Sequence, residues 1–397
     1  MRRLDLRKTQ AARLNTIRDI NRQIVLNYVR EREPISRAEI ARETNLQRST
    51  ISAIVEALTA EGLVEEIGEG ESTGGRRPTL LRLRTKEAIA IGVAITPSCT
   101  TIASSDLAGR IVEQEEFQTN ADPVKTFNQV VLLIKQLSAR NKGSIEAVGV
   151  SLPGLVDPST GNAVYVPYFK WRDVPVAKTI AAAVGLPVII DNDANAVALA
   201  ELWFGRPEVS DARDFILVLV AEGVGTGIIF DGQVYRGQRG AAGEFGHMVI
   251  GTKAPVPCSC GNSDCWEAFS SEGAAVARYL ALSGEAPNAQ FGFRELVDQA
   301  LRGESNARMA LTETAHYLGV GISNLVVGFS PEAVVVGGEI ARAWSLVKDA
   351  LMDTMEHSVR RGLASAQIMP STLGEKPELR GALSLVLASK FAAAFAA

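Results

Sequence analysis

The sequence contains no apolar run that approaches the roughly 18 residues needed to cross a bilayer, and only four of its 397 residues are cysteines. The N-terminus is rich in arginine, where a signal peptide would need an apolar stretch. Four cysteines are too few for a disulfide framework in a chain of this length. We therefore expect a cytoplasmic protein with no membrane partner. Because three of the cysteines lie within residues 258–265, we expect them to serve metal or redox chemistry.

Charge is divided unevenly along the chain. Residues 1–86 carry a net charge of +5, whereas the remaining residues carry −9. An apolar fraction of 46% is ample for the buried cores of two or three domains. A basic module in front of an acidic body indicates a nucleic-acid partner, although a solvated basic tail would have the same composition.

The basic module has the pattern of three short helices. Apolar residues recur at helical spacing over residues 21–30. Ser36 and Glu39 form a capping box, which predicts a second helix that runs to about Glu43. A third helix, over residues 47–61, presents an apolar stripe made of Ile51, Ile54, Val55 and Leu58. Three helices around such a stripe predict a helix-turn-helix, in which the third helix reads bases in the major groove.

Polar side chains at the start of the third helix face away from the stripe. Gln47 and Arg48 can form bidentate hydrogen bonds to adenine or guanine. The DNA contacts expected on this helix are Gln47, Arg48, Ser49, Thr50 and Ser52. Two short strands follow, and their glycine-rich tip carries Arg76 and Arg77, as in a wing that inserts arginines into the minor groove. A small three-helix bundle with a solvated polar face, and a tip whose arginines are merely exposed, are the alternatives.

The segments "SRAEIARETNLQRSTISAIVEALTAEGLV" and "GGRRP" resemble the N-terminal winged helix of the ROK family, in its transcriptional-regulator branch. The resemblance continues almost to the C-terminus. It implies a sugar-sensing body with the two-lobed actin/hexokinase-like ATPase fold, assembled as a homodimer or homotetramer. The expected units are a winged helix-turn-helix with a basic arm over residues 1–85, a first lobe over 86–200 to which a helix over 379–397 returns, and a second lobe with a zinc loop over 201–378.

The body has an α/β pattern of its own. The strand "AIAIGVAI" is followed by two more strands, a helix over residues 123–140 and the strand "IEAVGVSL". A similar system of strand and hairpin begins at "FILVLVAEGVGTGIIF". Together with the resemblance, this partial repeat predicts two similar lobes with a cleft between them.

One short stretch holds a set of metal-binding side chains. His247, Cys258, Cys260 and Cys265 supply one nitrogen and three sulfurs, the ligand set of a tetrahedral structural Zn²⁺ with no position open to water. The spacing resembles the ROK zinc signature, and the one departure is Asp264, where the family usually has glycine. A catalytic zinc, which would leave one position open, and redox-active cysteines are the alternatives.

Polar residues near this stretch and after one buried strand are candidates for ligand contacts. Asn192 and Asp193 follow the strand "PVIID", and ligands in open α/β sheets bind at the carboxyl ends of strands. From the residues alone Asp193 is equally an N-cap. The resemblance implies that Asp193 matches the general base of ROK kinases and that the zinc-bearing histidine also faces the ligand. The sugar contacts that it implies are Asn192, Asp193, Glu244, His247 and Glu267. Tyr168 stands where related proteins commonly carry asparagine, which alters the sugar accepted.

Two hairpins decide between a kinase and a sensor. Phosphoryl transfer needs glycine-rich hairpins whose N–H groups approach the phosphates, and an acid that holds Mg²⁺. Within Ala94–Ser98 the kinase aspartate has become Ala94, and Pro97 has no N–H to donate. Within Ala221–Glu222, Glu222 would repel a triphosphate by about one to a few kcal/mol in a partly buried site.

The sugar-side residues are thus present while the phosphate-side residues are lost. This selective loss predicts a sugar-responsive transcriptional regulator, a repressor of carbohydrate-metabolism genes that binds double-stranded operator DNA and transfers no phosphate. Asp193 would then be a vestigial base. An active ATP-dependent sugar kinase with an accessory DNA-binding domain, and an architectural DNA binder without a ligand, are the alternatives.

Overall fold

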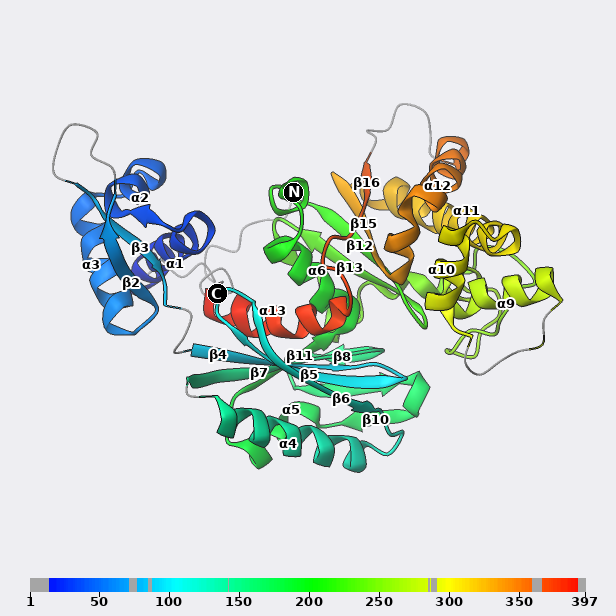
Figure 1. Ribbon diagram of the computed structural model, residues 1–397, viewed down its shortest axis with the longest axis horizontal. Helices are drawn as coiled ribbons and strands as arrows, with labels where there is room; N and C mark the ends of the chain where they lie inside the picture. Colours follow the sequence, from blue (N-terminus) through cyan, green and yellow to red (C-terminus); the bar gives the residue numbers. More distant parts are fainter. Residues whose placement is uncertain are drawn as a thin grey trace, which may run out of the picture.

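The computed structural model describes residues 14–70, 77–84, 88–141, 143–284, 286, 291–358 and 366–391. Figure 1 shows a small unit at the N-terminal end, drawn in blue, beside two larger layered regions that follow it along the chain. No helix among these described residues is long and apolar enough to span a bilayer.

The N-terminal unit is a three-helix bundle with a small antiparallel sheet. Its elements are α1 (Leu14–Arg32), β1 (Ile35–Ser36), α2 (Arg37–Thr44), α3 (Arg48–Ala60), β2 (Val64–Glu69) and β3 (Thr79–Leu83), with strand order β1-β3-β2. The expected stripe on α3 is buried. The capping box is confirmed, because the Glu39 amide donates to the Ser36 hydroxyl at 3.2 Å and the Ser36 amide donates to the Glu39 carboxylate at 2.8 Å.

The first helix is longer than its sequence pattern indicates. Its apolar periodicity starts at residue 21, whereas α1 starts at Leu14. A helix that has already nucleated gains one hydrogen bond for each residue added, so it extends past its apolar face. This winged helix-turn-helix occupies one end of the molecule (Figure 1).

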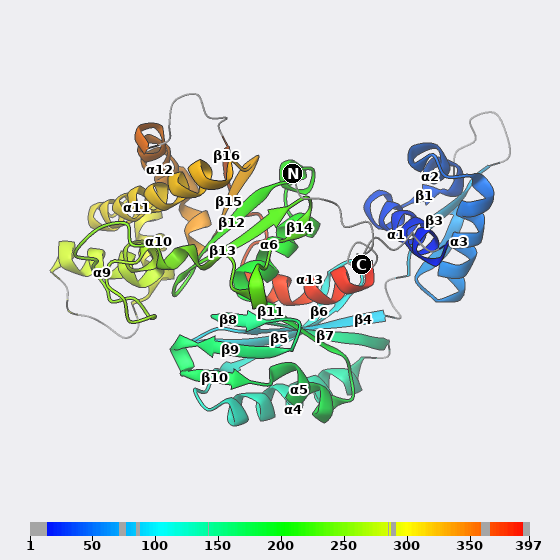
Figure 2. The same ribbon diagram turned by 180° about the vertical axis from the view of Figure 1, so that it is seen from behind.

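The first lobe is built on a mixed sheet in the order β11-β7-β4-β5-β6. Its elements are β4 (Ala88–Ile95), β5 (Cys99–Asp106), β6 (Ile111–Gln118), α4 (Pro123–Arg140), β7 (Ser144–Leu152), α5 (Val176–Val184) and β11 (Val188–Asn192). The helices α4 and α5 lie on one face of this sheet, and α13 (Pro377–Phe391) lies on the other (Figures 1 and 2).

The last helix packs on the first lobe although it follows the second lobe in sequence. A Cβ atom at Gly149 of β7 would lie 1.9 Å from the Ala382 carbonyl oxygen, so only glycine permits this approach. The expected returning helix over 379–397 begins two residues earlier, at Pro377, and its residues 392–397 lie outside the described residues.

A small sheet in the order β10-β9-β8 belongs to the first lobe and shares its core; its elements are β8 (Leu155–Asp157), β9 (Asn162–Val166), η1 (Pro167–Phe169) and β10 (Trp171–Val174). The helices α6 (Asp193–Phe204) and α7 (Pro207–Ser210) lead from the first sheet to the second lobe. The helix α6 starts directly at the end of β11, so the side chains at that junction lie where the first sheet ends.

The second lobe repeats the five-stranded plan, with strand order β14-β13-β12-β15-β16. Its strands are β12 (Phe215–Val220), β13 (Val224–Phe230), β14 (Gln233–Val234), β15 (Ala333–Gly338) and β16 (Gln367–Pro370). Its helices are η2 (Gln238–Gly240), η3 (Glu244–His247), α8 (Trp266–Ser270), α9 (Glu272–Ser283), α10 (Phe293–Arg302), α11 (Ser305–Phe329), η4 (Glu339–Ala343) and α12 (Trp344–Ser358).

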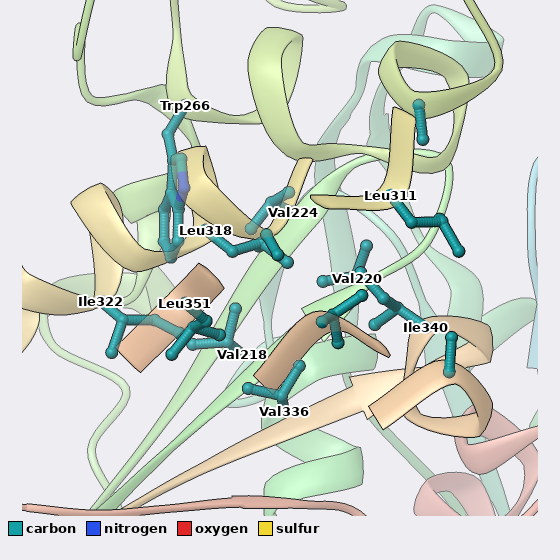
Figure 3. Close-up of a cluster of buried hydrophobic side chains, with 14 of the residues drawn as sticks. Val218, Val220, Val224, Trp266, Leu311, Leu318, Ile322, Val336, Ile340 and Leu351 are labelled. Carbon is teal, nitrogen blue, oxygen red and sulfur yellow. The ribbon is translucent and has the colours of Figure 1, made fainter. Parts of the chain in front are cut away.

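Trp266 fixes the start of α8 in the core of the second lobe. Figure 3 shows its ring beside Leu318 and Ile322, and its indole N–H donates to the Tyr317 carbonyl at 2.9 Å. A Cβ atom at Gly321 of α11 would lie 2.0 Å from the ring, so a glycine is needed for this packing. The neighbours of Trp266 along the chain, Cys265 and Glu267, are therefore held in place by a buried anchor.

Candidate ligand pocket and metal centre

The five residues expected to contact a sugar line one cavity between the lobes. They come from the β11–α6 junction, from η3 and from α8. The set consists of Asn192, Asp193, Glu244, His247 and Glu267. Thr96, Tyr168 and Glu222 line the same cavity.

The junction of β11 and α6 gives its two polar side chains different tasks. Asn192 is the N-cap of α6: its side-chain oxygen accepts from the Asn195 amide at 3.2 Å, and its side-chain nitrogen donates to the Gly154 carbonyl at 3.1 Å. The capping role thus falls on Asn192, while Asp193 is the first residue of the helix. Burial raises the pKa of Asp193 to about 6, and the nearby carboxylates of Glu222 and Glu244 act in the same direction.

The histidine and the three cysteines lie together. One ligand atom from each of His247, Cys258, Cys260 and Cys265 can be chosen so that all four lie within 4.8 Å of one another. The Sγ atoms of Cys258 and Cys260 are 3.1 Å apart, and His247 Nδ1 lies 3.3 Å from Cys258 Sγ. One imidazole nitrogen and three thiols at this separation could hold a metal ion.

His247 lies between this cluster and the cavity. Its Nδ1 faces Cys258, whereas its Nε2 lies 3.5 Å from a carboxylate oxygen of Glu244. Burial raises the pKa of Glu244, and the imidazole opposes that rise. The two ring nitrogens are therefore divided between the cysteines and the cavity.

The loop of the cysteines also positions Glu267, which is 7% exposed. Its Oε1 accepts from the Ser259 amide at 3.1 Å, from the Ser259 hydroxyl at 2.8 Å and from the Cys258 thiol at 2.9 Å. Asp264 adopts a left-handed φ of 62°, the conformation that favours glycine, and its side chain accepts from the Ala254 amide at 2.8 Å. That hydrogen bond offsets the strain of a non-glycine residue in the turn.

Tyr168 on η1 stands beside these acids. A Cβ atom at Gly223 would lie 2.8 Å from the Tyr168 hydroxyl and 2.8 Å from Glu267 Oε2, so the phenol and the carboxylate flank one point of the cavity. Burial raises the pKa of Tyr168, and the charge of Glu267 raises it further. The phenol is therefore a neutral hydrogen-bonding group at the edge of the polar set.

The two hairpins of the phosphate side touch each other directly. The Ser98 hydroxyl, from the β4–β5 hairpin, donates to Glu222 in the β12–β13 hairpin at 3.1 Å.

Gly338 has a φ of 95°, and a Cβ atom there would lie 1.9 Å from the Val220 carbonyl oxygen. Strand packing alone therefore requires a glycine at position 338.

Two further carboxylates lie beside this side of the cavity, and the sequence motifs did not reveal them. Burial raises the pKa of Glu272 to about 8 and that of Glu378 to about 7, and Glu222 adds to both shifts. The pKa of Glu272 is raised although this residue starts α9, and the N-terminus of a helix favours negative charge. Glu378 comes from α13, 156 positions after Glu222, so no local pattern places the two together.

The expected DNA contacts lie at the start of α3 and at the wing. Gln47, Arg48 and Ser49 are exposed, and Thr50 and Ser52 are half-buried. Gln47 is the N-cap residue of α3, but its side chain makes no capping hydrogen bond. Arg77 precedes β3 and is exposed, whereas Arg76 lies outside the described residues.

Comparison with known sequences places the whole chain among regulators. The ROK family model matches residues 90–389, and a MarR family model matches residues 24–77. The chain is 31% identical over 376 residues to the xylose repressor of Bacillus spizizenii, and the match covers 94% of this chain and 96% of that protein. It is 28% identical over 353 residues to the N-acetylglucosamine repressor of Escherichia coli O6:H1, with 87% and 86% coverage.

Comparison with solved structures gives both a regulator and a kinase. A ROK family transcriptional regulator described as a homologue of the E. coli MLC protein has a TM-score of 0.79 and 24% identity, covering 95% of this chain and 97% of that chain. A ROK family glucokinase from Streptomyces griseus, in complex with glucose and AMPPNP, has a TM-score of 0.67 and 29% identity, covering 75% and 98%. The first likeness shows the fold of the whole chain, and the second covers the body.

The raised pKa values of the carboxylates predict a pH dependence of stability. Between the ordinary pKa of 4.5 and the native value of about 8, Glu272 keeps a proton that the unfolded chain has released, so stability falls as the pH rises through this range. We expect the melting temperature to fall from pH 6 to pH 9, and to fall less in Glu272→Gln. Thermal denaturation at several pH values tests this, with exposed Glu208→Gln as the control. Equal slopes in wild type and Glu272→Gln would contradict it.

Proposed function

This chain belongs to the ROK family, and on that premise we propose that it is a sugar-responsive transcriptional repressor of carbohydrate-metabolism genes. Its kinase-like body senses the sugar and transfers no phosphate. One observation carries the proposal: the polar sugar-side residues line a single cavity, while the phosphate side of the same cavity holds carboxylates. The relatives named above as repressors support it.

The cavity offers a polyol the groups that it needs. Glu244 and Glu267 accept hydrogen bonds from hydroxyl groups, and Nε2 of His247 faces the cavity beside Glu244. The resemblance implies that Asp193 matches the base of a kinase, and here it would accept a hydrogen bond from a sugar hydroxyl without removing the proton. A charge-assisted hydrogen bond of this kind contributes roughly 1.5–3 kcal/mol.

The phosphate side opposes a nucleotide. The Glu222 carboxylate already accepts a hydrogen bond from the Ser98 hydroxyl of the other hairpin. Glu378 also lines the cavity. A triphosphate would bring negative charge next to Glu222, whose own charge already raises the pKa values of Glu272 and Glu378. Pro97 adds no N–H donor. A neutral sugar meets none of these obstacles.

The kinase alternative rests on Asp193 and on the likeness of the body to a glucokinase structure. It requires a Mg²⁺-bound triphosphate beside Glu222, which the charge of the site disfavours. We therefore hold the regulator as the main proposal and the kinase as the second.

The winged helix would bind double-stranded operator DNA in the cytoplasm. The face of α3 with Gln47, Arg48, Ser49, Thr50 and Ser52 would enter the major groove, while Arg76 and Arg77 would approach the minor groove. A homodimer or homotetramer would present two such helices to half-sites about 34 Å or a multiple apart. The units over 1–85, over 86–200 with 379–397, and over 201–378 would move relative to one another when sugar binds.

The metal centre would hold a structural Zn²⁺. His247, Cys258, Cys260 and Cys265 would be its four ligands, which leaves no position for water. Because Ser259, which follows Cys258, holds Glu267, and because His247 faces both sites, the ion would fix two of the sugar contacts. A bound ion supplies a rigid cross-link for the loop and takes no part in chemistry.

Sugar binding should release the protein from DNA. We expect a duplex selected by the wild-type protein from a random pool to dissociate on addition of one monosaccharide, with D-xylose tested first, then hexoses, amino sugars and sugar phosphates. Glu244→Gln should weaken sugar binding about 10- to 100-fold, because it removes a charged acceptor, and should leave DNA affinity unchanged. Fluorescence anisotropy and calorimetry measure the two affinities, with Glu208→Gln as the control. Indifference of the wild type to every sugar would contradict the proposal.

Metal removal should impair the pocket. We expect about one zinc ion per purified chain by mass spectrometry, as four protein ligands imply. Cys260→Ser should lower the zinc content, the melting temperature and the affinity for sugar together. Cys99→Ser is the matched control, because Cys99 on β5 lies outside the cluster. Full sugar affinity in zinc-free Cys260→Ser protein would refute this role.

A further inference from the structure

A segment of the second lobe is attached to the first lobe. We name residues 235–243, which connect β14 to η3, the strap. Arg236 of the strap places Nε and Nη2 at 2.7 Å from Oδ2 of Asp191, at the end of β11. Arg239 places Nε at 3.7 Å from Oδ2 of Asp157, at the end of β8. Both acids are buried on first-lobe strands, so the strap is held by two ion pairs that cross between the lobes.

The backbone of the strap also packs on the first lobe. Gly240 is buried, with a φ of 79°, and a Cβ atom there would lie 1.9 Å from the Val156 carbonyl oxygen of β8. The strap therefore moves with the first lobe wherever this contact and the ion pairs persist.

The ion pair of Asp191 and Arg236 lies close along the chain to expected sugar contacts from both lobes. Asn192 follows Asp191, and Glu244 follows the strap that contains Arg236. Oδ1 of Asp191 accepts from the Asn192 amide at 2.9 Å. The Arg236 carbonyl accepts from the Ala242 amide at 3.0 Å, which closes the strap into a loop just before Glu244. A ligand that pulls on Asn192 or Glu244 therefore acts on the two ends of one ion pair.

Arg236 and the winged helix also border one space. It lines a second cavity, of about 790 Å³, whose other walls include Asn27, Arg30 and Arg32 of α1. Trp203 of α6 lines that cavity, and its ring lies 3.9 Å from the guanidinium carbon of Arg30. One arginine side chain thus connects the buried acid beside the sugar residues with the space under the DNA-binding unit.

We infer that the Asp191–Arg236 ion pair couples the sugar pocket to the winged helix, with Arg236 as a positioning residue for the response to ligand. The inference rests on the proposed function and specifies how its regulation is transmitted. Arg236 is 36% exposed whereas Asp191 is buried, and breaking the pair would leave the buried carboxylate uncompensated, so Asp191 and Arg236 shift together when the junction at Asn192 shifts. Arg236 then changes the wall of the cavity that Asn27, Arg30 and Arg32 of α1 also line. Arg239, which does not line the second cavity, has no such connection.

Two matched substitutions separate coupling from sugar binding. The coupling ratio is the dissociation constant for the selected duplex in saturating D-xylose divided by that without sugar. We expect a wild-type ratio of roughly 10–100, in the usual range of allosteric coupling. Arg236→Gln should bring the ratio to within about twofold of one at saturating D-xylose, whereas Arg239→Gln should keep it within about threefold of the wild-type value.

Three outcomes would overturn the inference. Arg236→Gln could keep the wild-type coupling ratio. Alternatively, Arg239→Gln could lower the coupling ratio as much as Arg236→Gln does, which would indicate general loosening of the strap. Hydrogen exchange of the wild type provides a readout that needs no variant: D-xylose, or the panel sugar that releases the wild type from DNA if D-xylose does not, should change the exchange of residues 21–32, and unchanged exchange there would also overturn the inference. If neither D-xylose nor any other sugar of the panel releases the wild type from DNA, the proposed function itself fails, which is a distinguishable result.

Discussion

One side of the interlobe cavity disfavours added negative charge, and this constraint limits what the protein can hold there. Burial, together with the charge of the exposed Glu222, raises the pKa values of Glu272 and Glu378 to about 8 and about 7, so near neutral pH these two carboxyls tend to keep a proton. A triphosphate in that space would add charge of the same sign, whereas a neutral sugar adds none. On the proposed function, this difference between the two sides of the cavity would distinguish a sensor from a kinase built on the same fold.

The other half of the cavity depends on how the second lobe fixes its loop. Trp266, buried in the lobe core, anchors the start of α8, and the cysteine loop holds Glu267 through Ser259. His247 divides its two ring nitrogens between the cysteine cluster and the cavity. Ligand contacts that are held by a packed core, and by a loop that a metal ion would cross-link, need little reorganisation when the ligand arrives. A rigid pocket of this kind can pass a small displacement to its surroundings.

Local signals in the sequence predicted local structure well. The capping box at Ser36, the stripe on α3 and the approach of His247 to the three cysteines are all found in the structure. Contacts between distant segments carried no such signal. Glu378 reaches the cavity on α13, and Arg236 meets Asp191 across 45 positions, so their roles depend on the fold as a whole. At Asp264 the family glycine is absent, and the structure shows why the turn survives: the side chain binds the Ala254 amide.

The central claim is that the cavity accepts a sugar and repels a nucleotide. Calorimetric titration of the zinc-loaded protein with magnesium and AMPPNP, in the presence and absence of D-xylose, tests it most directly. The account predicts no detectable binding of the nucleotide up to about millimolar concentration. A binding free energy no more favourable than about −4 kcal/mol corresponds to that limit. Micromolar binding of AMPPNP with its magnesium ion, above all if ATP were then turned over with a sugar, would contradict it.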